Sequence, residues 1–160
     1  MPVPKSVIKL DKNGVTYTSN VDAASYTIRE LTRAALRDVG KFVRRKFMDE
    51  YYTVFRKHTG RGKKAISFVV LASNSTLYPR VEIGVKHSAN GKPVPGFYTY
   101  FHEVGTSKEP KRGILKKIVE GNIAQIVEIE SKYLTALEDE AAALRLIESE
   151  AEYTSEDNEE

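Results

Sequence analysis

The chain contains no cysteine and no tryptophan, and it has no uninterrupted apolar run of membrane-spanning length. The absence of cysteine excludes disulfide bonds and thiolate metal sites. A bilayer span needs roughly 20 apolar residues, so the sequence predicts no membrane partner. The N-terminal residues also lack the apolar centre of a signal peptide, which predicts that the protein is made and folds in a cytoplasm.

What the chain does contain is a globular composition and two oppositely charged parts. Its 160 residues are 41% hydrophobic and 29% charged, enough for one hydrophobic core. Residues 1–126 hold 23 Lys and Arg against 10 Asp and Glu, a net charge of +13, whereas residues 127–160 hold 2 against 12, a net charge of −10. This division favours a basic surface that meets nucleic acid or an acidic partner. A head-to-tail contact between identical copies would use both parts.

The first 60 residues predict a hairpin and a long helix. Residues 3–19 place two strand-like runs on either side of Asn13-Gly14, a pair typical of tight turns. From Asp22 to about His58, apolar residues recur at helical spacing, which predicts a long helix with a break or bend near Gly40. The other face of this helix is either a solvated surface or a stripe that follows DNA. It carries Arg29, Arg33, Arg37, Lys41, Arg44 and Arg45.

The rest of the chain predicts an α+β fold in which a small antiparallel sheet packs against the long N-terminal helix and a long C-terminal helix. Residues 65–72 and 80–86 read as paired strands. The aromatic run 97–101 is typical of a strand or of the start of a short helix, and we predict a third core strand, which also suits a subunit interface. Residues 114–151 keep helical periodicity. We expect one domain over residues 1–147 and a disordered acidic tail over 148–160, which holds seven carboxylates.

A basic loop precedes the first of these core strands, in the stretch HTGRGKKAISFVV at residues 58–70. It is not a nucleotide-binding P-loop, because Gly60 and Gly62 are too close together and no Ser or Thr follows Lys64. Basic residues without interleaved aromatic residues favour contact with a polyanion backbone over base readout. Arg61, Lys63 and Lys64 are therefore candidates for a DNA-channel or interface loop.

No motif for catalysis, a cofactor or a metal stands out. The three histidines lie in separate segments, and the HEVGT stretch at 102–106 lacks the second histidine of a zinc-binding helix. His102 and Glu103 could form an acid–base pair, but neighbours on a strand point to opposite faces. We expect no enzymatic activity, and a hydrolase using this pair is the weakest of the alternatives.

Two segments together resemble a family of small neck proteins of long-tailed bacteriophages and prophages, known as head–tail connector or tail-completion proteins. The first, HTGRGKKAI, resembles a family segment that opens the central strand, although Gly62 and Ala65 replace the usual leucine and serine. The second, YTYFHEVGTSKEP, resembles an aromatic segment that ends in Glu, an aromatic residue, Gly and Thr, with Val104 replacing the aromatic. The matching residues are Thr59, Gly60, Ile66, Tyr98, Phe101, Glu103, Gly105, Thr106 and Pro110.

The resemblance covers about residues 22–137 and implies a structural role in the virion. Members form a homo-oligomeric ring, which we expect to be six- or twelvefold, between the portal or head-closure protein and the tail-tube or tail-terminator protein. DNA would pass through the ring, and the protein would contact the backbone of the double-stranded DNA. The resemblance also implies that Gly105 adopts a positive φ. After residue 110 the match is poor. A stand-alone, non-specific DNA-binding protein remains the main alternative.

Overall fold

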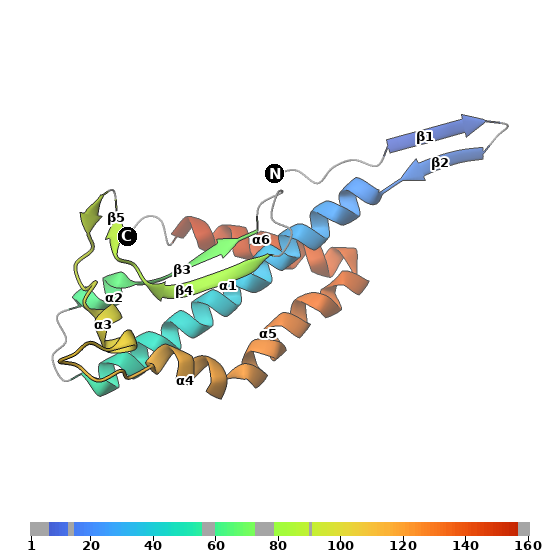
Figure 1. The fold of residues 1–160 in the computed structure, drawn as a ribbon. Coiled ribbons are helices and arrows are strands. Elements are labelled where there is room, and N and C mark those ends of the chain that lie inside the picture. The colour runs from blue at the N-terminus through green and yellow to red at the C-terminus, as the bar shows by residue number, and fades with distance from the viewer. Residues whose placement is uncertain (1–6, 13–14, 56–59, 73–78, 90, 157–160) are drawn as a thin grey trace. The chain divides into compact units, whose positions relative to one another are not determined.

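The computed structural model describes residues 7–12, 15–55, 60–72, 79–89 and 91–156, arranged as two compact units (Figure 1). One unit comprises Met1–Ala35 with Ser131–Glu160, and the other comprises Leu36–Glu130. The fold is broadly α+β, as predicted. The elements in chain order are β1 (Val7–Lys12), β2 (Val15–Ser19), α1 (Val21–Val54), α2 (Arg61–Ala65), β3 (Ile66–Leu71), β4 (Arg80–Val85), β5 (Ser88–Ala89), β6 (Lys92–Pro93), α3 (Thr99–Val104), α4 (Ile114–Gly121), α5 (Ile123–Thr135), the 3₁₀ turn η1 (Ala136–Glu138) and α6 (Glu140–Glu156).

The first unit contains the predicted N-terminal hairpin. Strands β1 and β2 pair antiparallel from Val7–Ser19 to Lys12–Val15, with an irregularity between Ile8 and Leu10. The Asn13-Gly14 turn lies outside the described residues. Buried apolar side chains of this unit come from the first part of α1 and from the C-terminal helices. They are Leu31, Ala34, Tyr133, Ala136 and Ala143.

The second unit joins the later part of α1 to the β3–β4 hairpin, which runs alongside it in Figure 1. The helix continues through Gly40, where the sequence suggested a bend. A Cβ on Gly40 would lie 2.5 Å from a ring carbon of Phe68, so only glycine lets helix and strand approach this closely. One turn further on, Arg44 donates from Nε to the Ile66 carbonyl at 2.9 Å. Part of the basic face of α1 therefore binds the strand.

The core of the second unit is built from α1, the first residue of β3 and α4. Strands β3 and β4 pair antiparallel over their full length, from Ile66–Val85 to Leu71–Arg80, as the sequence predicted. Phe47 is fully buried, and truncating such a side chain to alanine typically costs about 3–5 kcal/mol. The buried cluster consists of Val39, Val43, Phe47, Tyr51, Ile66, Ile114 and Ile118.

The prediction of a third core strand at residues 97–101 is wrong. These residues form a turn and the first part of α3, held by hydrogen bonds from Thr99 N to Gly96 O and from Gly105 N to Phe101 O. Aromatic residues favour strands where their side chains pack on a half-buried sheet surface. Here two glycines of positive φ, Gly96 and Gly105, flank the segment. The local chain reversals therefore override the strand propensity of the aromatic run.

The predicted single C-terminal helix is divided into α4, α5 and α6. Gly121 ends α4, and the Asn122 side chain donates to the Ile118 carbonyl at 2.7 Å, which satisfies one of the last carbonyls of that helix. A second break follows η1, where the Asp139 carboxylate accepts the Ala141 N–H at 2.9 Å at the start of α6. Helical periodicity continues across both breaks, so it could not reveal them. The acidic tail from residue 148 stays a prediction, although α6 runs to Glu156.

Candidate functional site

The basic stretch that the sequence placed in a loop forms the short helix α2. Gly60 occupies its N-cap with a left-handed φ of 71°, and Ile66, which begins β3, is only 1% exposed. Arg61 and Lys64 are exposed, and Lys63 lies on the same helix. Thr59 lies outside the described residues. The side chains of Arg61 and Lys64 are thus presented by a helical turn that leads directly into the core strand.

The structure brings α2 against α3, so the two segments that carry the family resemblance lie together. A Cβ on Gly96 would overlap the Arg61 carbonyl, and a Cβ on Gly62 would lie 3.3 Å from Thr99 Oγ1. Thr99 is fully buried and donates its hydroxyl to the Tyr51 phenol oxygen at 3.3 Å. We call this substructure, residues 60–66 and 96–115, the α2–α3 corner.

The inner side of the α2–α3 corner is a layer of rings on α1. Burial raises the pKa of the Tyr51 phenol above its ordinary value of 10.0, and the hydrogen bond from Thr99 opposes part of this effect. The Phe55 ring lies 4.5 Å from the Tyr51 ring and 4.4 Å from the His102 imidazole. The Arg112 guanidinium sits 4.9 Å from the Phe55 ring centroid. These contacts fix the corner on α1.

Three of the motif residues shape the loop between α3 and α4. The two carboxylate oxygens of Glu103 accept the backbone N–H groups of Ile114 and Leu115, each at 3.1 Å, so Glu103 caps α4. Gly105 has φ +84°, as predicted, and a Cβ there would lie 2.8 Å from the Lys111 nitrogen. Thr106 Oγ1 accepts the backbone N–H groups of Lys108 and Glu109. Both Glu103 oxygens therefore bind backbone rather than pairing with His102 for catalysis.

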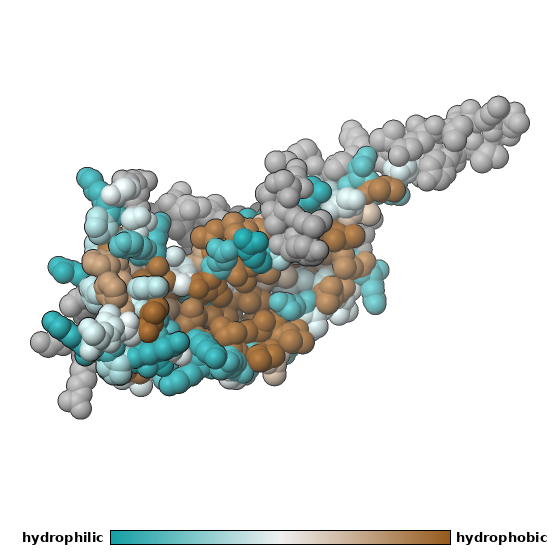
Figure 2. Space-filling model, in the orientation of Figure 1, coloured by the Kyte–Doolittle hydropathy of each residue, from teal (hydrophilic) through white to brown (hydrophobic). Residues whose placement is uncertain are grey.

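The outer side of α3 carries exposed apolar side chains. Tyr98 is 38% exposed, Tyr100 51%, Phe101 42% and Val104 49%. Another exposed apolar surface lies on α5, where Ile123 is 56% and Val127 55% exposed. Brown side chains gather over α5 in Figure 2, beside the teal side chains of α4. Contiguous apolar exposure of this kind marks surfaces that contact other proteins.

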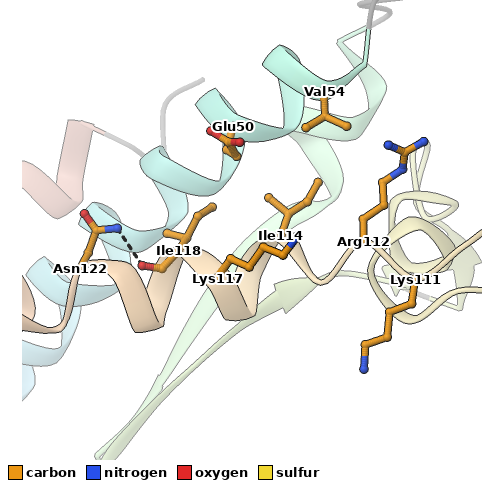
Figure 3. Close-up of a pocket in the computed structure, with 8 residues that line it drawn as sticks. All are labelled: Glu50, Val54, Lys111, Arg112, Ile114, Lys117, Ile118 and Asn122. Carbon is orange, nitrogen blue, oxygen red and sulfur yellow. Dashed lines mark hydrogen bonds between the residues drawn. The ribbon is translucent and has the colours of Figure 1, made fainter.

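A pocket of about 520 Å³ lies between α1 and the start of α4 (Figure 3). Figure 3 shows Glu50 and Val54 projecting from α1 toward α4, and Ile114 and Ile118 on the facing helix. Arg112 and Lys117 add positive charge to the lining. The Arg112 Nε is buried and has no hydrogen-bond partner among the described residues.

Sequence reasoning found the exposed cations and the motif residues, but it missed what holds them together. Gly96, Thr99 and Tyr51 carry the α2–α3 contact, and they lie far apart in the sequence. The proline–glycine pair before the aromatic run was the available signal for a chain reversal at Gly96. The basic face of α1 is mostly half-buried, and Arg33 pairs with Glu30 at 2.7 Å.

Comparison with known protein families, with curated proteins and with solved structures gives no match for this chain. In the described part of the chain, no group of three or more His, Asp or Glu side chains is placed to hold a metal ion. Across the same residues, no helix combines the length and apolar character needed to cross a bilayer. The geometry of the α2–α3 corner and of α5 therefore carries the functional argument.

Proposed function

We propose that this protein is a structural subunit of the neck of a long-tailed bacteriophage, where copies form a ring that joins head to tail. The observation that carries the proposal is the exposed aromatic face of α3, on a helix whose opposite side is locked to α1 through Thr99 and Tyr51. A rigid base under exposed aromatic side chains suits a protein interface, because few rotamers must be ordered on binding.

Ring formation draws support from the presence of two different exposed apolar surfaces. The α3 face and the exposed Ile123 and Val127 of α5 lie on separate elements, and both sets of residues belong to the second unit. When a surface on one copy meets a different surface on the next, the contact is heterologous, and such contacts close into rings when the rotation between copies allows it. We propose a six- or twelvefold ring in the virion neck, between the portal or head-closure protein and the tail-tube or tail-terminator protein.

The exposed cations of α2 fit a role at the DNA channel of such a ring. Arg61 and Lys64 can approach a phosphate backbone without reading bases, which suits DNA that passes through. The same cations also support the second candidate, a non-specific DNA-binding protein that acts alone. That protein would bind short duplexes as a monomer, with an affinity that falls steeply as salt rises.

A joining experiment tests the proposal. Heads and tails purified from particles that lack this protein should stay separate, and adding the purified protein should yield joined particles in electron micrographs. A gold-labelled tag on the protein should mark the junction. If the protein binds free DNA but neither labels the junction nor increases joining, the solitary DNA-binding function replaces the proposed one.

A further inference from the structure

The pocket between α1 and α4 combines an apolar floor with a positive edge. Val54, Ile114 and Ile118 provide the apolar side chains, and Arg112 and Lys117 outnumber the single carboxylate of Glu50. An anionic group that also carries an apolar side chain would satisfy both features of the pocket.

We infer that this pocket binds the acidic C-terminal segment, residues 148–160, of a second copy of the chain; the inference rests on the proposed ring for its setting. The segment carries seven carboxylates and a single aromatic residue, Tyr153. Its carboxylates match the Arg112 guanidinium and the Lys117 ammonium, and the Tyr153 ring matches the apolar floor. The net charges of +13 on residues 1–126 and −10 on residues 127–160 favour the same pairing.

An acidic segment suits this pocket better than a nucleic acid does. Duplex DNA presents phosphates on a rigid helix, and its backbone offers nothing to the side chains of Val54, Ile114 and Ile118. A cavity of about 520 Å³ accommodates one large side chain with its neighbours.

This contact would be heterologous, because the pocket and the segment are different parts of the chain. Each copy would offer its pocket to one neighbour and its C-terminal segment to the other. Repeated around a ring, such contacts would link each subunit to the next. They would stabilise the ring in addition to the contacts made by the apolar faces of α3 and α5.

The test begins with a labelled synthetic peptide of residues 144–160, titrated against full-length protein and followed by fluorescence anisotropy. Lys117→Glu should weaken peptide binding about fivefold, the size expected for one exposed charge pair. Lys116→Glu is the matched control, since Lys116 is exposed on the same helix but does not line the pocket. A peptide with Tyr153→Ser should also bind more weakly. Circular dichroism checks that both variants keep the fold.

A second measurement asks which copy supplies the segment. Unlabelled and ¹⁵N-labelled full-length protein are mixed and cross-linked with a carbodiimide, which joins lysines to carboxylates. Links between Lys117 and residues 148–160 that combine both isotopes support the inference, whereas single-isotope links alone overturn it. The inference is also wrong if the Lys117→Glu and Lys116→Glu variants bind the peptide equally well. It is wrong too if Lys117→Glu weakens binding of duplex DNA but not of the peptide. If rings form without these cross-links, the pocket contact is wrong and the proposed ring function is unaffected. If the cross-links form between copies but no rings are seen, the proposed ring is wrong and the pocket contact is supported.

Discussion

Individual residues of the α2–α3 corner act through backbone geometry as much as through side-chain chemistry. Gly105 makes room for the Lys111 backbone, and Glu103 holds the first N–H groups of α4. The positive φ of Gly105 could be predicted from the sequence, because a glycine inside a turn motif has few other roles. The partner of Glu103 could not, since Ile114 lies eleven residues further along the chain, after a loop that carries no periodicity.

Gly105→Ala should destabilise the protein more than Gly91→Ala. Both glycines have positive φ, +84° and +74°, which costs an alanine about 1 kcal/mol. A Cβ on Gly105 would also meet the Lys111 backbone, whereas one on Gly91 would meet no described atom within 4 Å. We expect a loss of about 2–4 kcal/mol for Gly105→Ala, measured as the free energy of unfolding in urea. Equal losses in the two variants would show that the loop yields to the extra methyl group.

The Tyr51 phenol should make the protein less stable in alkali. Its pKa is raised in the folded state, so the folded protein holds this proton more tightly than the unfolded chain does. That contribution is complete below the unfolded pKa of about 10 and is lost as the pH rises through the folded pKa. Tyr51→Phe should lose about 1 kcal/mol at pH 8, because the Thr99 hydrogen bond disappears.

Between pH 8 and pH 10.5 the urea midpoint of the Tyr51→Phe variant should therefore fall less than that of the native protein. Tyr100→Phe serves as the control, because Tyr100 is 51% exposed and is not among the groups that shift the Tyr51 pKa. Parallel declines in the native protein and the Tyr51→Phe variant would contradict the assignment of alkaline instability to the buried phenol.

At the scale of elements, strong periodicity predicted where the long helix and the paired strands lie, but it did not reveal where the C-terminal helices end. Helix α1 and the β1–β2 and β3–β4 pairs lie close to their predicted ranges. Residues of the aromatic run form part of α3 because the positive-φ glycines on either side of the run override its strand propensity. The breaks at Asn122 and Asp139 depend on single capping side chains within a continuous apolar pattern. At these two positions, capping residues indicate the helix ends better than periodicity does.

Helix α4 should depend on its distant cap. Glu103→Ala removes both acceptors at its N-terminus and should cost about 1–2 kcal/mol, the usual range for a lost cap. Glu109→Ala, an exposed glutamate in the same loop, provides the control and should change stability by less than about 0.5 kcal/mol. Thermal unfolding of the two variants measures the difference. A Glu103→Ala variant as stable as the control would mean that water replaces the carboxylate without loss.

The outer face of α3 should be needed for assembly but not for folding. Tyr100 and Val104 are 51% and 49% exposed, so changing both to serine should leave the free energy of unfolding within about 1 kcal/mol of the native value. The same double change should abolish self-association, because it removes the apolar centre of the interface. Val69→Ser alters a residue that is 54% exposed on β3 and should leave association intact.

Sedimentation velocity of the native, α3 and Val69 proteins distinguishes these outcomes. Normal association of the α3 double variant would place the interface elsewhere. Loss of association in both variants would indicate a general effect of surface polarity rather than a specific contact.

For the whole molecule, the division of charge is the feature that the sequence made plainest. From +13 on the first 126 residues and −10 on the remainder we predict that copies of the chain associate head to tail. The symmetry of that association does not follow from composition, because it depends on the angle between two surfaces that meet only in the assembly. Screening acts within about 10 Å at 0.1 M salt, so charge-driven association should weaken as salt is raised.

The most direct test of the ring proposal is electron microscopy of the purified protein across a range of concentrations, at 0.05 M and 0.5 M salt. We predict closed rings with a central opening and six or twelve subunits, more abundant at the lower salt concentration. Adding tails or heads should recruit the same rings to the junction end of each particle. Monomers at every concentration and salt level, with and without tails or heads, would contradict the proposed role in the neck.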